Sequence, residues 1–316
     1  MRPIFVYSSP NPHLIASVRL SAIIPASHIG TEAAYFGRDM DPAAFLDKHR
    51  PTTLIITKAF DEGPLHLAKC AVARGVKIVT ELCNSDQLSD ADGKMNAELA
   101  ALSAGIVVHT PIMAKEAQRA FGKPCTIIEE PTEYPRGAAA FNPGAVIKLL
   151  WFGISAHHDT LHEGIKSLLR FDRPMQLLIL SNEIPTFLNE IVWPPSFRHR
   201  VVPWAFDIQY EGFKWCDLVF LPGLDRLDKQ TRSPNRLVES INAGRLAIAH
   251  PLPQYQELAD FCVCRSDYVD ALRSALADLE LSLAKIQRGQ RYIAGRYSPH
   301  IVSRKWADFV AEIEIR

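Results

Sequence analysis

The sequence has no excess of charge of either sign. Its 316 residues include 35 Lys and Arg against 35 Asp and Glu, and each half of the chain is close to neutral. Domains that bind nucleic acid are usually basic, and segments that bind acidic membranes carry clusters of Lys and Arg. Neither pattern is present, so the sequence argues against a nucleic-acid partner.

Long apolar runs and paired cysteines are also missing. No segment approaches the roughly 20 apolar residues that cross a bilayer, and the apolar run at the amino terminus is too short for a signal peptide. The six cysteines are scattered through apolar stretches and form no Cys-x-x-Cys pair, which is typical of free thiols in a reducing compartment. We therefore expect a cytoplasmic protein without a transmembrane segment.

Internal repeats and low-complexity segments are absent as well. What remains is an alternation of short apolar runs and longer amphipathic ones, the pattern of parallel strands joined by helices. The expected strands of the first half are 4–8, 31–36, 53–57, 76–80, 105–110 and 125–129. Those of the second half are 146–152, 175–181, 199–202, 218–221, 246–249 and 261–264. At roughly 150 residues per domain, this length predicts two α/β domains.

A segment rich in proline and glycine, residues 131–144, separates the two halves and is interpreted as an interdomain linker. Residues 271–293 have a long helical pattern, and Pro299 is expected to open a last helix that runs to residue 313. Gly75 and Gly105 are expected at helix ends, where glycine accepts the left-handed conformation.

The most informative segment covers residues 229–257. Ser233 is a favourable N-cap residue and Pro234 suits the first helical position, so a helix is expected to begin here. Asn235 and Glu239 lie four residues apart and share one face of that helix. The polar side chains near the start of the helix are therefore expected to act together.

This arrangement fits a nucleotide diphosphate. A helix amino terminus at the mouth of a parallel sheet presents N–H groups and the positive end of the helix dipole, both of which attract phosphate. Lys229, Arg232 and Arg236 add cationic donors beside it. Glu239, one turn further along, is a carboxylate suited to the hydroxyl pair of a ribose. The competing interpretation is a solvated amphipathic helix whose charges bind no ligand.

The same segment resembles the donor-binding segment of GT-B glycosyltransferases, with the carboxy-terminal pattern of the family 4 (group 1) enzymes. The resemblance rests on the helix with Glu239, on Ala243-Gly244, and on Pro253-Gln-Tyr-Gln-Glu257. Weaker likenesses extend over nearly the whole chain and lie in Ser17-Val-Arg19, Leu149-Leu-Trp-Phe-Gly153 and Trp215-Cys-Asp217-Leu-Val-Phe-Leu-Pro222.

The resemblance implies two Rossmann-like domains that face each other across a crevice. Residues 1–135 would bind the acceptor, residues 145–295 the nucleotide sugar, and residues 296–316 would form a helix that returns to the first domain. The implied reaction moves a sugar from a nucleotide-diphosphate sugar to a hydroxyl acceptor, as in polysaccharide or cell-envelope glycan synthesis. We expect this reaction to need neither a cofactor nor a metal ion, and the resemblance favours retention of the sugar's anomeric configuration. Peripheral contact of the protein with a membrane is left open.

The helix pattern and the resemblance together nominate three groups of residues. The expected catalytic residues are Lys229, Arg232 and His109. The expected donor-binding residues are Gly153, His157, Trp204, Ser233, Asn235, Arg236 and Glu239. The expected acceptor-side residues are Ser17, Arg19 and Glu81.

Several of these residues have a second interpretation. His109 and Glu81 end strands of the first domain, so each would contact the acceptor or act as a base, or else serve as a hydrogen-bonded structural residue. Arg19 would hold an acceptor anion or pair with a nearby carboxylate. Trp204 would stack on a nucleotide base or pack in the core.

The sequence also departs from the family pattern. Retaining members often carry two glutamates separated by seven residues; Glu239 matches the second, but Thr231 stands at the first. Many members have an arginine soon after the glycine turn, where this chain has Gly153-Ile-Ser-Ala-His157-His158. Two alternatives stay open: a sugar-nucleotide epimerase or hydrolase on the same fold, which would use the same donor site without an acceptor sugar, and a non-catalytic GT-B-like protein, which the missing first glutamate permits.

Two Asp-x-Asp patterns resemble the metal-holding pattern of the other glycosyltransferase fold. They are Asp39-Met-Asp41 and Asp90-Ala-Asp92. Asp41 precedes Pro42 and an alanine-rich stretch, so it is better interpreted as a helix cap, and no metal site is expected.

Overall fold

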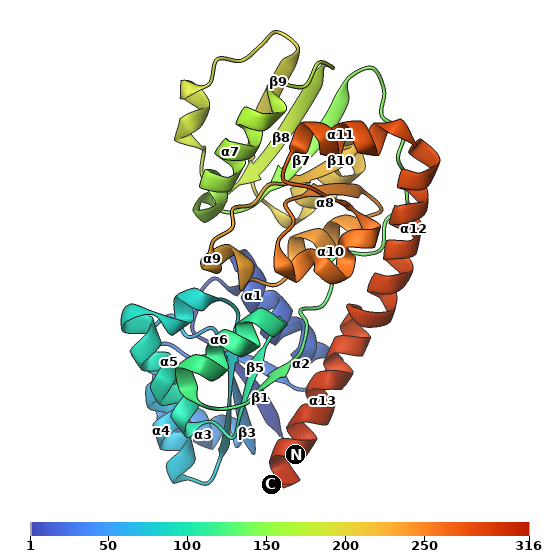
Figure 1. The fold of residues 1–316 in the computed structure, drawn as a ribbon. Coiled ribbons are helices and arrows are strands. Elements are labelled where there is room, and N and C mark those ends of the chain that lie inside the picture. The colour runs from blue at the N-terminus through green and yellow to red at the C-terminus, as the bar shows by residue number, and fades with distance from the viewer. Residues whose placement is uncertain (1, 316) are drawn as a thin grey trace. The chain divides into compact units, whose positions relative to one another are not determined.

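The computed structural model describes residues 2–315, which divide into two compact units. Unit 1 comprises the residues up to 133, residues 230–233 and the residues from 296 onward, and unit 2 comprises residues 134–229 and 234–295. Each unit is built around a six-stranded sheet (Figure 1). No helix in residues 2–315 is long and apolar enough to cross a lipid bilayer.

The sheet of unit 1 has the strand order β2-β1-β3-β4-β5-β6, and every neighbouring pair is parallel. Its strands are β1 (Pro3–Tyr7), β2 (Glu32–Tyr35), β3 (Thr53–Thr57), β4 (Lys77–Leu82), β5 (Gly105–Val108) and β6 (Cys125–Ile127). Its helices are α1 (Ala16–Val18), the π-helical turn η2 (Arg19–Ile23), α2 (Ile24–Ile29), α3 (Pro42–His49), α4 (Gly63–Ala73), α5 (Asp90–Leu102), α6 (Pro111–Phe121) and α13 (Pro299–Ile315), with 3₁₀ turns η1 (Pro12–Leu14) and η3 (Ser85–Leu88). The strand order reverses between β1 and β3.

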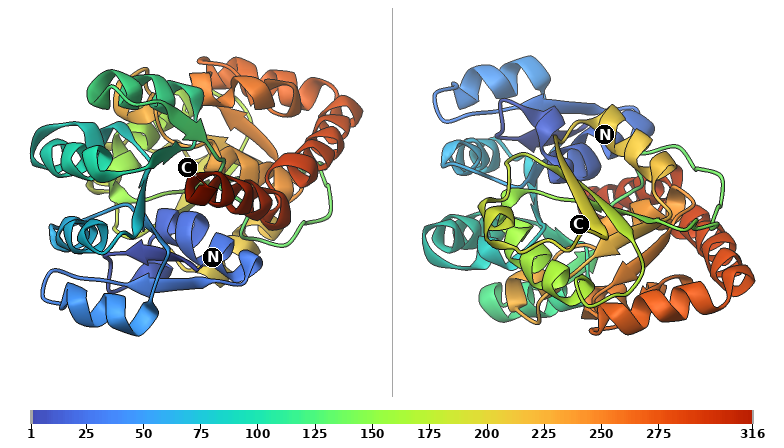
Figure 2. Two further views of the ribbon diagram at one scale, coloured as in Figure 1. Left: turned by 90° about the horizontal axis from the view of Figure 1, so that it is seen from below. Right: turned by 90° about the horizontal axis from the view of Figure 1, so that it is seen from above.

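Apolar residues cover both faces of this sheet because alternate residues of each strand point to opposite sides. On one face, Leu54 belongs to a core cluster with Phe45 of α3 and Leu67 of α4. On the other face, Phe5 packs edge-on against Trp306 of α13, with ring centroids 5.3 Å apart. Figure 2 shows α13 beside α2 on that face. The last helix of the chain therefore completes the core of unit 1.

The sheet of unit 2 has the order β12-β11-β10-β7-β8-β9 and is also wholly parallel. Its strands are β7 (Ile147–Phe152), β8 (Met175–Ser181), β9 (Phe197–Pro203), β10 (Leu218–Leu221), β11 (Leu246–Ala249) and β12 (Val263–Cys264). Its helices are α7 (His158–Leu168), α8 (Phe206–Trp215), α9 (Leu227–Gln230), α10 (Asn235–Asn242), α11 (Tyr268–Ala277) and α12 (Leu279–Arg296), with 3₁₀ segments η4 (Ser155–His157), η5 (Thr186–Glu190) and η6 (Pro253–Phe261). This is the order of dinucleotide-binding Rossmann sheets, and it reverses between β7 and β10.

All twelve expected strands are present, with ends within two residues of the expected ones. The single helix expected over residues 271–293 is wrong. The chain breaks at Asp278, whose φ of −142° and ψ of 98° are extended, into α11 and α12. The Asp278 carboxylate accepts a hydrogen bond from the Leu281 N–H at 2.8 Å, so this residue caps α12 and favours the break.

The two glycines expected at helix ends behave differently. Gly75 follows α4 with a φ of +77°, as expected. Gly105 begins β5 and is not left-handed, so its expected role is wrong. A Cβ at Gly105 would lie 2.7 Å from the Phe309 ring, so glycine is needed there to admit α13 against the sheet.

Part of the segment interpreted as a linker is hydrogen-bonded within unit 2. The Gly137 N–H donates to the Asn242 carbonyl at 3.0 Å, and the Ala140 N–H donates to the Gly244 carbonyl at 3.1 Å. The approach is close enough that a Cβ at Gly137 would lie 2.3 Å from the Ala243 carbonyl oxygen. Residues 137–140 are therefore fixed against the end of α10.

Candidate functional site

The loops that follow β7 and β10 meet where the strand order of unit 2 reverses. Ligands of open α/β sheets bind at such a point, outside the carboxyl ends of the strands. The loop after β7 contains Gly153 and leads through His157 into α7, and the loop after β10 leads into α9. Two predicted donor-binding residues therefore stand at the expected edge of the sheet.

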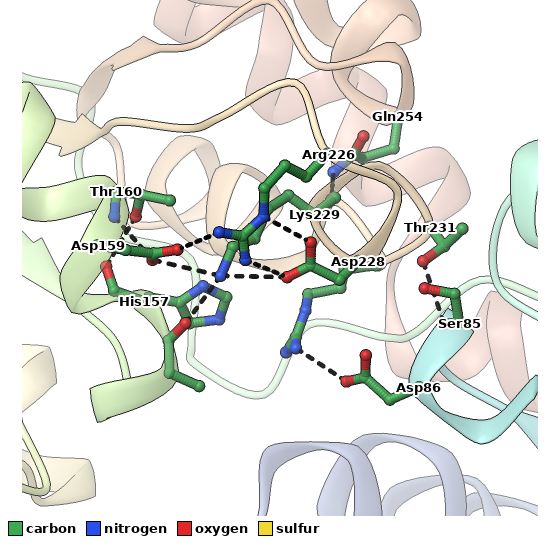
Figure 3. A network of polar contacts seen from close by, with 12 residues as sticks. Ser85, Asp86, His157, Asp159, Thr160, Arg226, Asp228, Lys229, Thr231 and Gln254 are labelled. Atoms are coloured by element: carbon green, nitrogen blue, oxygen red, sulfur yellow. Dashed lines mark hydrogen bonds and ion pairs between the residues drawn. The ribbon is translucent and has the colours of Figure 1, made fainter. Parts of the chain in front are cut away.

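A network of charged side chains joins these two loops (Figure 3). The Lys229 ammonium group donates to the Ala156 carbonyl at 2.7 Å and lies 3.4 Å from the carboxylates of both Asp159 and Asp228. Arg226 binds the same two carboxylates, each at 2.9 Å. Two positive and two negative charges therefore cancel within the cluster.

Asp228 remains ionised at neutral pH within this network. Hydrogen bonds from Arg226 lower the pKa of Asp228 to about 2, with Lys229 contributing and partial burial opposing the shift. Lys229 is 4% exposed, and its carbonyl also accepts a hydrogen bond from the Gln254 amide at 2.7 Å. The amine that the sequence assigned to phosphate is thus already engaged by its own chain, and Arg226 was not identified from the sequence.

Helix α10 begins one residue later than the sequence predicts. Its N-cap is Pro234, and the Ser233 hydroxyl donates to the Glu130 carboxylate within unit 1. A capping serine must accept a hydrogen bond from the helix backbone. Here the hydroxyl serves as a donor to an anion, and hydrogen bonds to charged acceptors are stronger. The predicted capping role of Ser233 is therefore wrong.

Arg236 and Glu239 both lie on α10, and Arg236 lies beside the end of β7 and Gly153. The Arg236 guanidinium carbon is 5.3 Å from the Trp151 ring centroid and 5.4 Å from that of Phe152, within cation–π range. A Cβ at Gly153 would lie only 3.0 Å from the Trp151 ring. Glu239 is 1% exposed, and glutamate is almost never buried so deeply without a partner. A guanidinium and a buried carboxylate thus share one helix at the sheet edge.

Two further residues that the sequence predicts to bind the donor sugar nucleotide are Asn235 and His157. The Nδ2 atom of Asn235 is buried and has no hydrogen-bond partner within residues 2–315, so it is available to a ligand. His157 is the N-cap residue of α7, and its carbonyl accepts a hydrogen bond from the Thr160 hydroxyl at 2.8 Å. His157 therefore shapes the turn after β7 through its backbone.

Trp204 follows β9 and precedes α8. Its indole N–H donates to the Gln209 side-chain oxygen at 2.5 Å, which fixes the ring beside α8. Phe206, the first residue of α8, is 43% exposed and stacks on Tyr134 with centroids 4.2 Å apart. The sequence analysis did not identify Phe206, because a single exposed aromatic ring has no distinguishing spacing.

In unit 1, His109 directly follows β5 and contacts Glu81 of β4. The His109 Nε2 atom is 2.5 Å from a Glu81 carboxylate oxygen, and Nδ1 is 2.8 Å from the Ile128 carbonyl. Burial by itself lowers the pKa of His109. The charge of Glu81 and its hydrogen bond, with Glu130 and the Ile128 carbonyl contributing, outweigh burial and raise the pKa to about 9. His109 is therefore an imidazolium at neutral pH.

A protonated His109 does not accept a proton, which argues against its predicted role as a base. The Ser21 hydroxyl lies 3.2 Å from the same Nε2 atom that faces Glu81. In a nucleophilic serine triad the serine and the acid occupy opposite ring nitrogens, so this is not such a triad. The second carboxylate oxygen of Glu81 is buried and has no partner within the described part of the chain, so it can accept a hydrogen bond from a ligand.

Ser17 lies in α1, and Arg19 is the first residue of the π-helical turn η2 that follows it. Arg19 forms a two-point ion pair with Glu133, at 2.7 and 2.9 Å, and donates to the His13 carbonyl at 2.5 Å. Of the two interpretations of Arg19, pairing with a nearby carboxylate is the one that the structure shows. The Ser17 hydroxyl oxygen is buried and has no hydrogen-bond partner among residues 2–315. Segments of π-helix often lie at functional sites, and this one brings Ser21 to His109.

Residues 230–233 belong to unit 1. The Arg232 guanidinium is 3.3 Å from the Asp86 carboxylate, and the Thr231 hydroxyl accepts a hydrogen bond from the Ser85 N–H at 3.1 Å (Figure 3). Thr231, which stands where the resemblance expects a glutamate, is fully buried. The segment that was assigned to the diphosphate is therefore held beside η3 of unit 1.

Lys58 is a feature that the sequence analysis missed. It directly follows β3, at the point where the strand order of unit 1 reverses, and it has a φ of +38°. Strained residues of this kind are frequent at functional sites. Its ammonium group lies 5.2 Å from the exposed Phe60 ring. No signal in the sequence marks this position, because lysine does not favour the left-handed conformation.

The first Asp-x-Asp pattern behaves as predicted. The Asp41 carboxylate accepts a hydrogen bond from the Ala43 N–H at 2.9 Å and caps α3. The second pattern includes the Asp90 side chain, which lies outside the described part of the structure.

No protein-family profile and no curated protein matches the sequence. Solved structures do match it. Alr3699/HepE from Anabaena, in complex with UDP and glucose, has a TM-score of 0.72 at 11% identity, covering 99% of this chain and 100% of that one. A glycosyltransferase from Rickettsia africae has a TM-score of 0.67 at 12% identity, covering 99% and 98%. MurG from Acinetobacter baumannii has a TM-score of 0.54 at 12% identity, covering 99% and 100%.

These likenesses show the fold. The chain has the GT-B architecture of two Rossmann-like domains over nearly its whole length. The fold class implied by the resemblance in the donor-binding segment is therefore confirmed.

Proposed function

We propose that this protein is a glycosyltransferase that moves a sugar from a nucleotide-diphosphate sugar to a hydroxyl acceptor. The observation that carries the proposal is that α10 holds Arg236 against the end of β7 and carries the buried Glu239 three residues further along. A protein of the same fold has been solved with UDP and glucose, and also with UDP-glucose. The fold therefore accommodates the class of ligand that this helix is suited to bind.

On the donor side, α10 would bind the diphosphate. Backbone N–H groups at its start and the Arg236 guanidinium would donate to the phosphate oxygens, with the Asn235 amide as a neutral donor. Glu239 would accept hydrogen bonds from the ribose hydroxyls. Trp204 and the exposed ring of Phe206 offer aromatic surfaces for the base.

The leaving diphosphate would be stabilised by fixed hydrogen-bond donors without a metal ion. Arg236 is the principal cation in this proposal. Lys229 and Arg232 are each bound to carboxylates of the chain, so we assign them to positioning the loops that precede α10.

On the acceptor side, Glu81 would orient a hydroxyl group. The His109 imidazolium holds Glu81 in place through one carboxylate oxygen and leaves the other for the acceptor. Because His109 is protonated at neutral pH, it does not supply the base that inversion requires, and we favour retention. The resemblance implies that the acceptor is a glycan of a polysaccharide or the cell envelope.

The first test is calorimetry of nucleoside diphosphates against the wild type and Glu239→Gln. The substitution preserves size in a buried position but removes the charge, and a hydrogen bond to a charged group contributes about 1.5–3 kcal/mol. We expect the wild type to bind at least one nucleoside diphosphate and the variant to bind it tenfold or more weakly. Glu211→Gln, an exposed position on α8, is the matched control and should bind as the wild type does.

Equal affinity in Glu239→Gln and the wild type would remove Glu239 from the donor site. Binding of no nucleoside diphosphate at all would favour a non-catalytic protein. Incubation of labelled nucleotide sugars without an acceptor separates the remaining alternatives, because an epimerase or hydrolase forms product there and a transferase requires the acceptor.

A further inference from the structure

Two of the six cysteines lie side by side at the edge of the unit 2 sheet. Cys262 and Cys264 flank Val263 in and beside β12, the outermost strand of the sheet. Alternate residues of an extended strand point to the same side. The two Sγ atoms are accordingly only 3.5 Å apart. In the sequence the pair has the spacing Cys-x-Cys, which a search for Cys-x-x-Cys passes over.

We propose that Cys262 and Cys264 are a thiol-oxidation site that closes into a reversible intramolecular disulfide. Two residues of extended strand span about 6.6 Å between Cα atoms, and disulfides join Cα atoms that are about 4.4–6.8 Å apart. The backbone spacing is thus at the upper end of the range that a disulfide tolerates.

The position of β12 allows the small movement that closure requires. The strand has two residues and pairs on one side only, through Val263 opposite Ile248 and Cys264 opposite Ala249. The sulfur atoms must approach from 3.5 Å to about 2.05 Å. A short strand at the edge of a sheet can bend by this amount without breaking pairs between the central strands.

The two thiols differ in the way that a stepwise oxidation needs. Cys262 is 1% exposed, whereas Cys264 is partly exposed and accessible to a reagent. The hydrogen bond from Cys262 lowers the pKa of Cys264, against the effect of burial, and Lys285 adds to the lowering. The same contact, together with burial, raises the pKa of Cys262. Cys264 is thus the attacking sulfur and Cys262 the resolving one.

The oxidant is a low-molecular-weight disulfide. The Cys264 thiolate attacks one sulfur of that reagent, releases its first thiol and forms a mixed disulfide. Cys262 then loses its proton and attacks the Cys264 sulfur, which releases the second thiol. Two electrons pass from the cysteine pair to the sulfur–sulfur bond of the reagent, and the two cysteine protons end on the released thiols.

A bound metal ion is a poorer explanation for the pair. Structural zinc takes four ligands, usually cysteine and histidine. Among the side chains that the structure describes, which leave out Asp90, no group of three or more His, Cys, Asp or Glu residues is placed to hold a metal ion.

The test uses the full-length protein and oxidised glutathione. After treatment, remaining thiols are blocked with N-ethylmaleimide and the peptides are analysed by mass spectrometry. We expect a disulfide within the peptide that contains Cys262 and Cys264, and its loss on reduction. Cys262→Ser should instead retain a glutathione adduct on Cys264, and Cys264→Ser should form neither product. Cys125→Ser, which removes another partly buried thiol, is the control and should leave the disulfide intact.

The proposal is overturned if N-ethylmaleimide labels both Cys262 and Cys264, which shows that neither was oxidised, while Cys70 has reacted with glutathione. Cys70 is also partly exposed and reports that the oxidant was effective. The proposal is equally overturned if the disulfide forms only in denaturant. The same holds if Cys264 of the wild type retains its glutathione adduct and forms no disulfide with Cys262. The readout is a mass and requires no enzymatic activity, so its outcome is independent of the donor-binding experiment.

Discussion

The charge of His109 is decided by the groups around it. A buried imidazole in apolar surroundings is neutral, because burial disfavours the charged form. Here Glu81 contacts one ring nitrogen and the Ile128 carbonyl the other, and the pKa of His109 is raised from 6.5 to about 9. The folded protein therefore binds a proton on His109 that the unfolded chain releases between these two values.

This proton makes the stability of unit 1 depend on pH. Because the folded pKa lies above the unfolded one, the contribution of His109 is complete below pH 6.5 and is lost as pH rises through about 9. The free energy of unfolding should fall across this interval by at most about 1.4 kcal/mol per pH unit. Equilibrium urea unfolding at several pH values measures it.

His109→Gln should remove most of this slope, and His28→Gln, at an exposed position of α2, should preserve it. An identical slope in His109→Gln and the wild type would show that another group is responsible for the pH dependence.

At the residue scale, the sequence indicated which residues have side chains suited to a ligand better than it indicated which other residues those side chains contact. Asn235 and Glu239 were identified because their spacing on one helix is a property of the sequence, and Arg236 was identified as a cation near the start of that helix. Ser233 was assigned wrongly because its partner, Glu130, is about 100 residues away in the chain, and local capping rules do not include it. Lys229 was identified as a cation, but one of the two carboxylates that neutralise it belongs to the neighbouring residue and the other to the first turn of α7, about 70 residues away.

At the scale of elements, both ends of α10 are determined by contacts with segments that are distant in the sequence. Its end rests on Gly244, whose φ is +76°, and an added Cβ would lie 2.3 Å from the Ala138 carbonyl oxygen. The sequence indicated the glycine as a helix stop. It did not indicate that the segment then interpreted as a linker lies against it.

Gly244→Ala should therefore destabilise unit 2 strongly. The left-handed conformation costs a residue with a side chain roughly 1–2 kcal/mol, and the overlap with Ala138 adds to that cost. Thermal unfolding should show a lower melting temperature than the wild type. Gly295→Ala, where an added Cβ meets nothing within 4 Å, is the control and should change little. If Gly244→Ala has the same melting temperature as the control, residues 137–140 move aside to accommodate the added Cβ at little energetic cost.

Strands were predicted more accurately than helix breaks, for a physical reason. A strand that is buried on both faces in a parallel sheet is a continuous apolar run, so its ends are visible in the sequence. The break at Asp278 interrupts an amphipathic pattern that continues on both sides of it. Only the cap contact with Leu281 distinguishes the break, and a single aspartate does not predict that contact.

At the scale of the whole molecule, unit 1 is assembled from three separate parts of the chain. Residues 230–233 and the residues from 296 onward join the first 133 residues. Composition and periodicity report only local structure, so they did not show that residues 230–233 leave the second half of the chain. The family resemblance did lead us to expect a last helix that returns, and α13 lies in unit 1.

Trp306→Ala tests how far the first unit depends on the end of the chain. Trp306 is 1% exposed and packs edge-on against Phe5 and against Phe309, with centroids 5.3 and 6.3 Å apart. Removing a buried tryptophan costs about 3–5 kcal/mol, so unit 1 should become less stable. Hydrogen exchange measured by mass spectrometry should then accelerate in β1, β3 and β4, whose apolar residues share a core with α13.

The same measurement distinguishes the two units, because Trp306 belongs to one core cluster and the strands of unit 2 to another. Strands β7 and β8 should retain their protection in Trp306→Ala. Trp193→Ala, which removes a ring stacked on His199 at 4.1 Å in unit 2, should produce the opposite pattern. If Trp306→Ala accelerates exchange equally in β1 and β8, the two units unfold together and the division of the core is wrong.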